Sequence, residues 1–128
     1  MTMAAPTLRP LILICDDELP LRELVKAVLG DGYRYVEAED VDQAQEVLKE
    51  SEPEAIVLDV MLPGKSGLEF LSELRTQRRS KEIPVVVVSA WQSADDQRTA
   101  LKAGADAFVG KPFDPKDLAS VVEALIAA

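Results

Sequence analysis

Short apolar runs alternate along this chain with longer segments whose apolar residues recur every three or four positions. The short runs are rich in Val, Ile and Leu and are bounded by polar residues, which is typical of strands. We expect strands at Leu11–Cys15, Tyr33–Glu37, Ala55–Leu58, Ile83–Val88 and Asp106–Val109. Tyr33–Glu37 is more polar and is expected near a sheet edge, whereas Ile83–Val88 is apolar on both sides and should be covered on both faces.

A helix is expected after each run, because the apolar positions there follow the helical period. The stripes comprise Leu21, Leu24, Val25, Val28 and Leu29; Ala44, Val47 and Leu48; Leu68, Leu71 and Leu74; several alanines with Leu101; and Leu118, Val121, Val122, Leu125 and Ile126. The expected N-terminal caps are Asp40, Ser66, Ser93 and Asp114.

Five strand–helix units in succession predict an α/β fold with a parallel sheet between two layers of helices. Right-handed crossovers leave few topologies. We expect a doubly wound five-stranded parallel sheet of flavodoxin-like strand order 2-1-3-4-5, with five helices. Residues 1–10 are expected to form a flexible N-terminal arm, and residues 11–128 a single folded domain.

Composition narrows the classes of function. The formal net charge of -9 argues against direct nucleic-acid binding by this domain, because phosphates would be repelled. The chain has no histidine, so any phosphohistidine chemistry must use a histidine of another protein. Its single cysteine, Cys15, allows no internal disulfide and is expected to be a small core residue. Since no apolar run is long enough to span a membrane, we expect a soluble cytoplasmic protein.

Polar residues follow four of the predicted strands, at the ends where ligands bind in open parallel sheets. They are Asp16, Asp17, Asp59, Ser89 and Lys111. Under the proposed strand order they would share one rim, where three carboxylates would repel one another unless a cation such as Mg²⁺ were bound. With a hydroxyl and an ammonium beside them, these residues suit transfer of a phosphoryl group to a carboxylate.

At these positions the chain resembles the response-regulator receiver family of two-component signal transduction. The resemblance runs from Leu11 to Ile126 and rests on four motifs. They are Asp16-Asp17, Leu58-Asp59-Val60-Met61-Leu62-Pro63-Gly64, Ser89-Ala90 and the segment Gly104–Phe113, which contains Lys111-Pro112.

The resemblance implies roles for the acidic residues. Asp59 would be the phosphoacceptor. Asp17 and Asp59 would bind Mg²⁺ or Mn²⁺ directly, together with the backbone carbonyl of Met61, and Asp16 would act mainly through a bound water.

The resemblance also assigns the remaining motif residues. Ser89 and Lys111 would each bind a phosphoryl oxygen. Ser89 and the aromatic residue Phe108 would form the switch that changes the surface of the fourth helix, fifth strand and fifth helix. The bond between Lys111 and Pro112 is expected to be cis, as is common in the family.

Partners are implied only as classes. The phosphoryl group would come from a sensor histidine kinase or a histidine phosphotransfer protein, and the switch would control a downstream protein or a fused output domain. The protein would be a signalling receiver rather than an enzyme, apart from its own phosphotransfer and dephosphorylation, and a homodimer would be compatible with this role. Met61 and Trp91, two positions beyond Asp59 and Ser89, could hinder water and lengthen the phosphoryl lifetime.

Three alternatives stay open from the sequence. A haloacid-dehalogenase-type phosphatase also uses an Asp nucleophile, but needs a second Asp at the position of Met61. A flavodoxin-like cofactor binder needs a phosphate loop where Asp16 and Asp17 would repel phosphate. The third alternative is a receiver that no longer accepts phosphate and serves only as a binding module.

Overall fold

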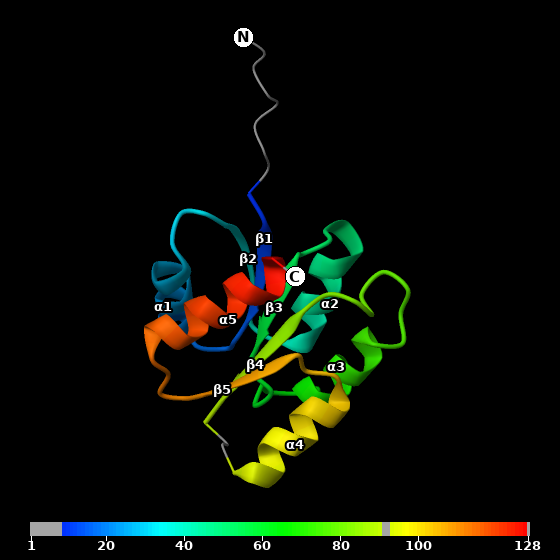
Figure 1. Cartoon of the computed structure of the whole chain (residues 1–128). Helices are drawn as coiled ribbons and strands as arrows, with labels where there is room; N and C mark the ends of the chain where they lie inside the picture. The colour runs from blue at the N-terminus through cyan, green and yellow to red at the C-terminus, as the bar shows by residue number, and fades with distance from the viewer. Residues whose placement is uncertain (1–8, 91–92, 128) are drawn as a thin grey trace.

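A five-stranded parallel sheet forms the centre of the molecule, in a computed structural model that describes residues 9–90 and 93–127. Its strands lie in the order β2-β1-β3-β4-β5 (Figure 1), which confirms the predicted fold class. The strands are β1 (Leu11–Cys15), β2 (Arg34–Ala38), β3 (Ala55–Leu58), β4 (Val85–Ser89) and β5 (Ala107–Gly110).

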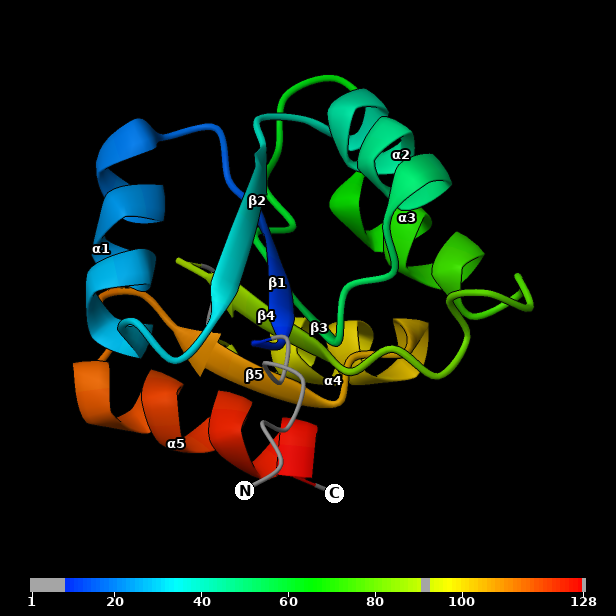
Figure 2. The same ribbon diagram turned by 90° about the horizontal axis from the view of Figure 1, so that it is seen from above.

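Helices cover both faces of this sheet. They are α1 (Leu19–Leu29), α2 (Val41–Glu50), α3 (Gly67–Leu74), α4 (Ala94–Ala103) and α5 (Pro115–Ala127). Helices α1 and α5 lie on one face and α2, α3 and α4 on the other, as Figure 2 shows. This double winding brings the carboxyl ends of all the strands to one rim.

Successive residues of each central strand belong to different cores. Ile12 and Ile14 pack under α1 and α5, whereas Leu13 packs under α2, α3 and α4. All residues of β3 and β4 are buried, which confirms the prediction that the fourth strand is covered on both faces. Burial on both faces fixes the register, because a slip of one residue would exchange the two cores.

Three of the predicted strands were wrong by one or two residues at each end. The fourth strand starts at Val85 rather than Ile83, since Pro84 has no N–H to donate and contributes only its carbonyl, which accepts from Ile56 at 2.9 Å. The second strand covers Arg34–Ala38, and the fifth ends at Gly110 because its ladder with β4 extends to Ser89.

Two leucines assigned to buried stripes are exposed instead. Leu24 of α1 is 45% exposed and Leu101 of α4 is 50% exposed. In α1 the inward position three residues before Val25 is taken by Arg22, which is buried. In α4 only Ala100 is buried, so this helix is held by a narrow apolar contact. The capping residues behave as predicted, with Asp40, Ser66 and Ser93 each accepting a backbone N–H.

Within the ranges 9–90 and 93–127, every helix is too short or too polar to cross a bilayer. The arm predicted for residues 1–10 lies largely outside the described residues, which begin at residue 9.

The two packing classes of leucine give a direct test of this fold. Leu118→Ala, at a fully buried position of α5, should lower the free energy of unfolding by about 3 kcal/mol, because it leaves a cavity between α5 and the sheet. Leu101→Ala is the matched control and should cost less than about 0.5 kcal/mol. Urea titration followed by circular dichroism measures both, and equal losses would contradict the assignment of α5 to the core.

Candidate functional site

The strand ladder places the predicted site residues on one rim. Asp16 follows β1 and Asp59 follows β3, and the Asp59 N–H donates to the carbonyl of Cys15 at 2.9 Å. On the other side, Ser89 ends β4, and the Lys111 N–H donates to its carbonyl at 2.8 Å. Loops that are far apart in the sequence are thus joined by backbone hydrogen bonds at the carboxyl end of the sheet.

The ammonium group of Lys111 bridges two buried carboxylates. Its Nζ lies 3.0 Å from Oδ2 of Asp16 and 2.9 Å from Oδ2 of Asp59. Burial alone would lower the pKa of Lys111, but the hydrogen bonds and negative charges of Asp59 and Asp16 outweigh burial and raise the pKa above its ordinary value. Lys111 is therefore cationic at neutral pH and offsets part of the negative charge of the site.

Asp16, Asp17 and Asp59 form a carboxylate cluster that could hold a metal ion. One oxygen of each carboxylate lies within 4.8 Å of the others. Asp16 and Asp59 are buried, while Asp17 is exposed and gives the cluster an opening to solvent. Hard oxygen ligands at a partly hydrated position suit Mg²⁺.

Backbone N–H groups orient the two buried carboxylates. Oδ1 of Asp16 accepts from the N–H of Glu18 at 2.9 Å, and Oδ1 of Asp59 accepts from the N–H of Met61 at 2.8 Å. Each carboxylate oxygen has a second lone pair. The cluster therefore keeps acceptor capacity for a cation after its hydrogen bonds are made.

The other predicted residues surround this cluster. Ser89 is fully buried at the end of β4, and Phe108 is half-buried on β5, opposite Val87 in the ladder. The peptide bond between Lys111 and Pro112 is cis. Met61 is 38% exposed beside Asp59.

Trp91, the other residue proposed to limit water access, lies outside the described residues. Cys15 is buried at the end of β1, and burial, followed by the charge of Asp16, raises the pKa of its thiol.

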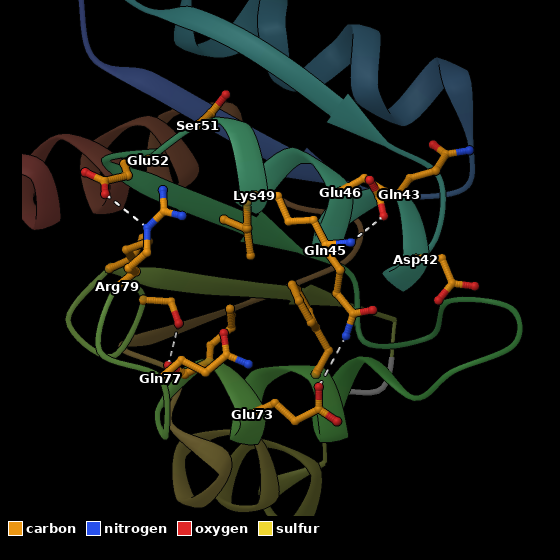
Figure 3. Close-up of a pocket in the computed structure, with 15 residues that line it drawn as sticks. Asp42, Gln43, Gln45, Glu46, Lys49, Ser51, Glu52, Glu73, Gln77 and Arg79 are labelled. Atoms are coloured by element: carbon orange, nitrogen blue, oxygen red, sulfur yellow. Dashed lines mark hydrogen bonds and ion pairs between the residues drawn. The ribbon is translucent and has the colours of Figure 1, made fainter.

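A separate groove of about 530 Å³ lies between α2 and α3. Figure 3 shows its polar rim, where Gln45 donates to Glu73 and Arg79 pairs with Glu52. Phe70 and Leu74 contribute to its apolar lining. None of the three clustered aspartates lines this groove, so it is distinct from the carboxylate site.

Sequence patterns missed one residue that contacts the site. Arg22 of α1 is buried, and its Nη1 donates to the backbone carbonyl of Asp16 at 2.8 Å. The sequence signal that could have indicated this residue is its position, three residues before Val25 in the apolar stripe of α1. A charged residue there is ordinarily interpreted as solvent-facing, which is why the pattern did not indicate it.

Fold and cluster together define a doubly wound α/β protein with an acidic cluster that could hold a metal ion at the carboxyl end of its sheet. Residues 12–123 match the family model described as the response regulator receiver domain. The chain belongs to the response-regulator receiver family, as its sequence motifs predicted.

Individual relatives agree with this assignment. The phosphate regulon transcriptional regulatory protein PhoB of Escherichia coli K12 is 42% identical over 116 residues, which are 90% of this chain and 51% of PhoB. The chain therefore spans about half the length of that relative.

Solved receiver structures have the same fold. The receiver domain of NtrX from Brucella abortus has a TM-score of 0.83 and 33% identity, with 91% of this chain and 98% of that one covered. The BeF3-activated DrrB receiver domain has a TM-score of 0.86 and 26% identity, with 94% and 100% covered.

Removing the bridging ammonium tests its structural role. Lys111→Met should lower the free energy of unfolding of the metal-free protein by about 2 kcal/mol at pH 7, because two buried carboxylates lose their counter-charge. Lys116→Met, at an exposed position of α5, is the control and should cost less than about 0.5 kcal/mol.

The difference in stability between wild type and Lys111→Met should depend on pH. A lysine whose pKa is higher in the folded than in the unfolded protein stabilises the folded state. This stabilisation is fully present at a pH below the pKa of the unfolded state and is lost as the pH rises through the pKa of the folded state. The gap between wild type and Lys111→Met should therefore persist through neutral pH and narrow above the ordinary value of 10.5. Equal stability of the two lysine variants at pH 7 would contradict the bridging role.

Proposed function

We propose that this chain is a signalling switch that accepts a phosphoryl group on Asp59 in a Mg²⁺-dependent reaction. The observation that carries the proposal is the position of the Asp59 carboxylate, which pairs with the Lys111 ammonium at 2.9 Å and has an oxygen within 4.8 Å of those of Asp16 and Asp17. Membership of the receiver family supports this role over the phosphatase and flavodoxin alternatives.

The phosphoryl donor would be a phosphohistidine on a sensor kinase or on a phosphotransfer protein, because this chain has no histidine. An oxygen of Asp59 attacks phosphorus, a P–O bond forms, and the P–N bond to the donor imidazole breaks. The imidazole leaves with the electron pair of that bond and takes up a proton. Asp59 becomes an acyl phosphate, a mixed anhydride that water can later hydrolyse.

Lys111 and Ser89 would position the transferred group. The ammonium that now bonds Asp59 Oδ2 can pair with a phosphoryl oxygen, and the Ser89 hydroxyl can donate to another. Asp17, Asp59 and the carbonyl of Met61 would hold Mg²⁺, with Asp16 acting through water. When bound, the cation neutralises the carboxylates and the phosphoryl oxygens.

The signal would leave through α4, β5 and α5. Ser89 ends β4, and Phe108 lies on the adjacent strand β5, so a shift of Ser89 toward the phosphoryl group would free space for Phe108 to turn inward. Helix α4 is suited to move, because Ala100 is the only residue it buries. The altered face would control a downstream protein or a fused output domain.

Residues at the mouth of the site would set the phosphoryl lifetime. Met61 is partly exposed beside Asp59, where its apolar side chain can keep a hydrolytic water away from phosphorus. The same role for Trp91 rests on its sequence position alone.

Intact mass spectrometry tests the phosphoacceptor directly. Incubation with Mg²⁺ and acetyl phosphate should add the mass of one phosphoryl group to the wild type. Asp59→Asn should gain none, because an amide oxygen cannot form the acyl phosphate. Asp106→Asn, a variant of an acidic residue outside the cluster, controls for nonspecific modification and should be labelled like wild type. Labelling of Asp59→Asn to the wild-type extent would contradict the proposal.

Amide chemical shifts test the switch. Adding Mg²⁺ with a beryllofluoride phosphoryl mimic should shift amides of α4, β5 and α5 as well as those of the site. Phe108→Leu should keep the site shifts and lose most of the distant ones, because the smaller side chain cannot transmit the movement. Shifts confined to residues around Asp59 in the wild type would refute the switch while leaving phosphorylation intact.

A further inference from the structure

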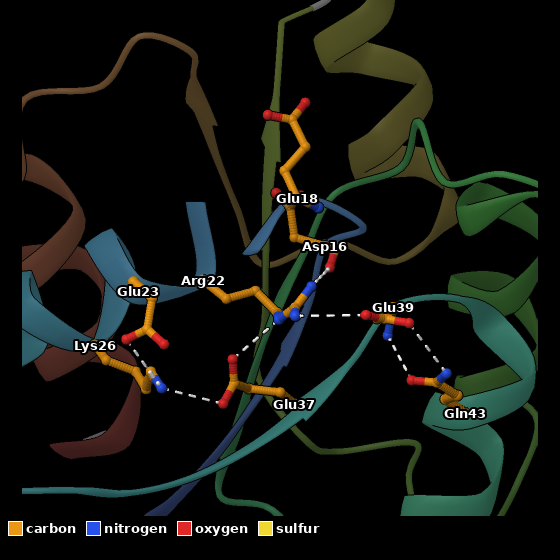
Figure 4. A network of polar contacts seen from close by, with 8 residues as sticks. All are labelled: Asp16, Glu18, Arg22, Glu23, Lys26, Glu37, Glu39 and Gln43. Atoms are coloured by element: carbon orange, nitrogen blue, oxygen red, sulfur yellow. Dashed lines mark hydrogen bonds and ion pairs between the residues drawn. The ribbon is translucent and has the colours of Figure 1, made fainter. Parts of the chain in front are cut away.

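Arg22 is a buried cation beneath the acidic loop that follows β1. Its Nη1 donates to the carbonyl oxygen of Asp16 at 2.8 Å, and its Nε donates to the carboxylate of Glu37 at 2.9 Å. Its Nη2 lies 3.6 Å from the carboxylate of Glu39. Figure 4 shows the guanidinium between the loop and strand β2. Burying an arginine is favourable only when such partners are present, so these contacts fix its position.

The peptide group between Asp16 and Asp17 is fixed from one side by this arginine. The N–H of Asp16 donates to the carbonyl of Ala38 at 3.0 Å, and the carbonyl of Asp16 accepts from Arg22. The Asp16 carboxylate has its own partners in Glu18 and Lys111. Both backbone polar groups of Asp16 are thus bonded to β2 or α1.

Asp17 differs from the other two members of the cluster. Within the described part of the chain, no residue makes a hydrogen bond or ion pair with its exposed carboxylate. The direction in which that carboxylate projects therefore depends on the backbone that carries it. That backbone begins at the peptide group whose oxygen Arg22 holds.

Glu37 in turn holds Arg22. Its second carboxylate oxygen accepts from Lys26 at 3.1 Å. Burial would raise the pKa of Glu37, but the hydrogen bonds and charges of Lys26 and Arg22 lower it overall, so the carboxylate stays ionised at neutral pH. A guanidinium reaches a carbonyl and a carboxylate at once because its N–H groups diverge in one plane, whereas a lysine ammonium on a flexible stem has no such fixed fork.

We propose that Arg22 is a positioning residue for metal binding, which fixes the Asp16–Asp17 peptide so that the Asp17 carboxylate stays aimed at the cluster. The inference rests on the proposed function, in which Asp17 binds Mg²⁺. Residues that orient metal ligands change metal affinity without touching the ion. An arginine acting only through its charge would have the opposite effect, since its removal would make the site more negative and would strengthen cation binding.

Isothermal titration with MgCl₂ separates these two roles in the full chain. Arg22→Lys keeps the charge and should raise the dissociation constant for Mg²⁺ about tenfold, because the fork is lost. Lys26→Met is the matched control, because Lys26 is the other cation bonded to Glu37 and, within the described residues, makes no hydrogen bond to the loop after β1. The dissociation constant of this variant for Mg²⁺ should stay within about twofold of wild type. Wild-type affinity in Arg22→Lys, or tighter binding in Arg22→Met, would overturn the positioning role.

Two further measurements keep the inference distinct from the proposed function. The rate of phosphorylation by acetyl phosphate in Arg22→Lys should recover to within about twofold of wild type at saturating Mg²⁺, since only ligand placement is impaired. In the metal-free protein, the ¹⁵N order parameter of the Asp17 amide should fall in Arg22→Lys and not in Lys26→Met.

These readouts distinguish failure of the inference from failure of the proposed function. Absence of Mg²⁺ binding by the wild type would refute the proposed function and, with it, the role of Arg22 in metal binding. An unchanged Asp17 order parameter in Arg22→Lys would refute the role of Arg22, whether or not metal binds. Glu37→Gln keeps Arg22 but weakens the contact that holds its guanidinium. This variant should give a loss of Mg²⁺ affinity between those of wild type and Arg22→Lys, and it replaces Arg22→Met if that variant does not fold.

Discussion

The contact of one lysine ammonium with two buried carboxylates is the interaction on which the site depends. Asp16 and Asp59 come from loops after β1 and β3, and Lys111 reaches them from the loop after β5. Three carboxylates this close would repel one another in the absence of counter-charge. Lys111 compensates part of that charge, and under the proposed function the remaining negative charge attracts a divalent cation.

The sheet is what makes this contact available. Five parallel strands bring every strand-to-helix loop on one rim to the same end, and burial on both faces of β3 and β4 fixes their register. The exposed Asp17 opens the site to solvent, while α4 stays lightly packed. The charged rim thus lies on a tightly packed core and near a helix that buries little surface. In this arrangement, a chemical change at the rim can alter the surface that includes α4.

The sequence predicted the approximate positions of the strands from their apolar runs. It also predicted which residues share the rim, because the carboxyl ends of parallel strands lie at the same edge of a sheet. The ends of the strands were less predictable. The apolar run of the fourth strand continues through Ile83 and Pro84, but the strand itself begins at Val85. The inward assignment of Leu24 and Leu101 was wrong because periodicity gives a stripe but not the width of its contact. Arg22 was missed for a different reason: a buried cation is recognised only when its partners, here from β2 and the acidic loop, are placed around it.

Paramagnetic relaxation by Mn²⁺ would test most directly whether the acidic rim is one cation site. Substoichiometric Mn²⁺ should broaden the amide resonances nearest Asp17, Asp59 and Met61 first, and excess Mg²⁺ should restore them. Resonances around Glu46 and Glu73, acidic residues of the α2–α3 groove, should stay sharp at the same Mn²⁺ concentration. Broadening distributed equally over both acidic regions, or absent from the rim, would contradict the account.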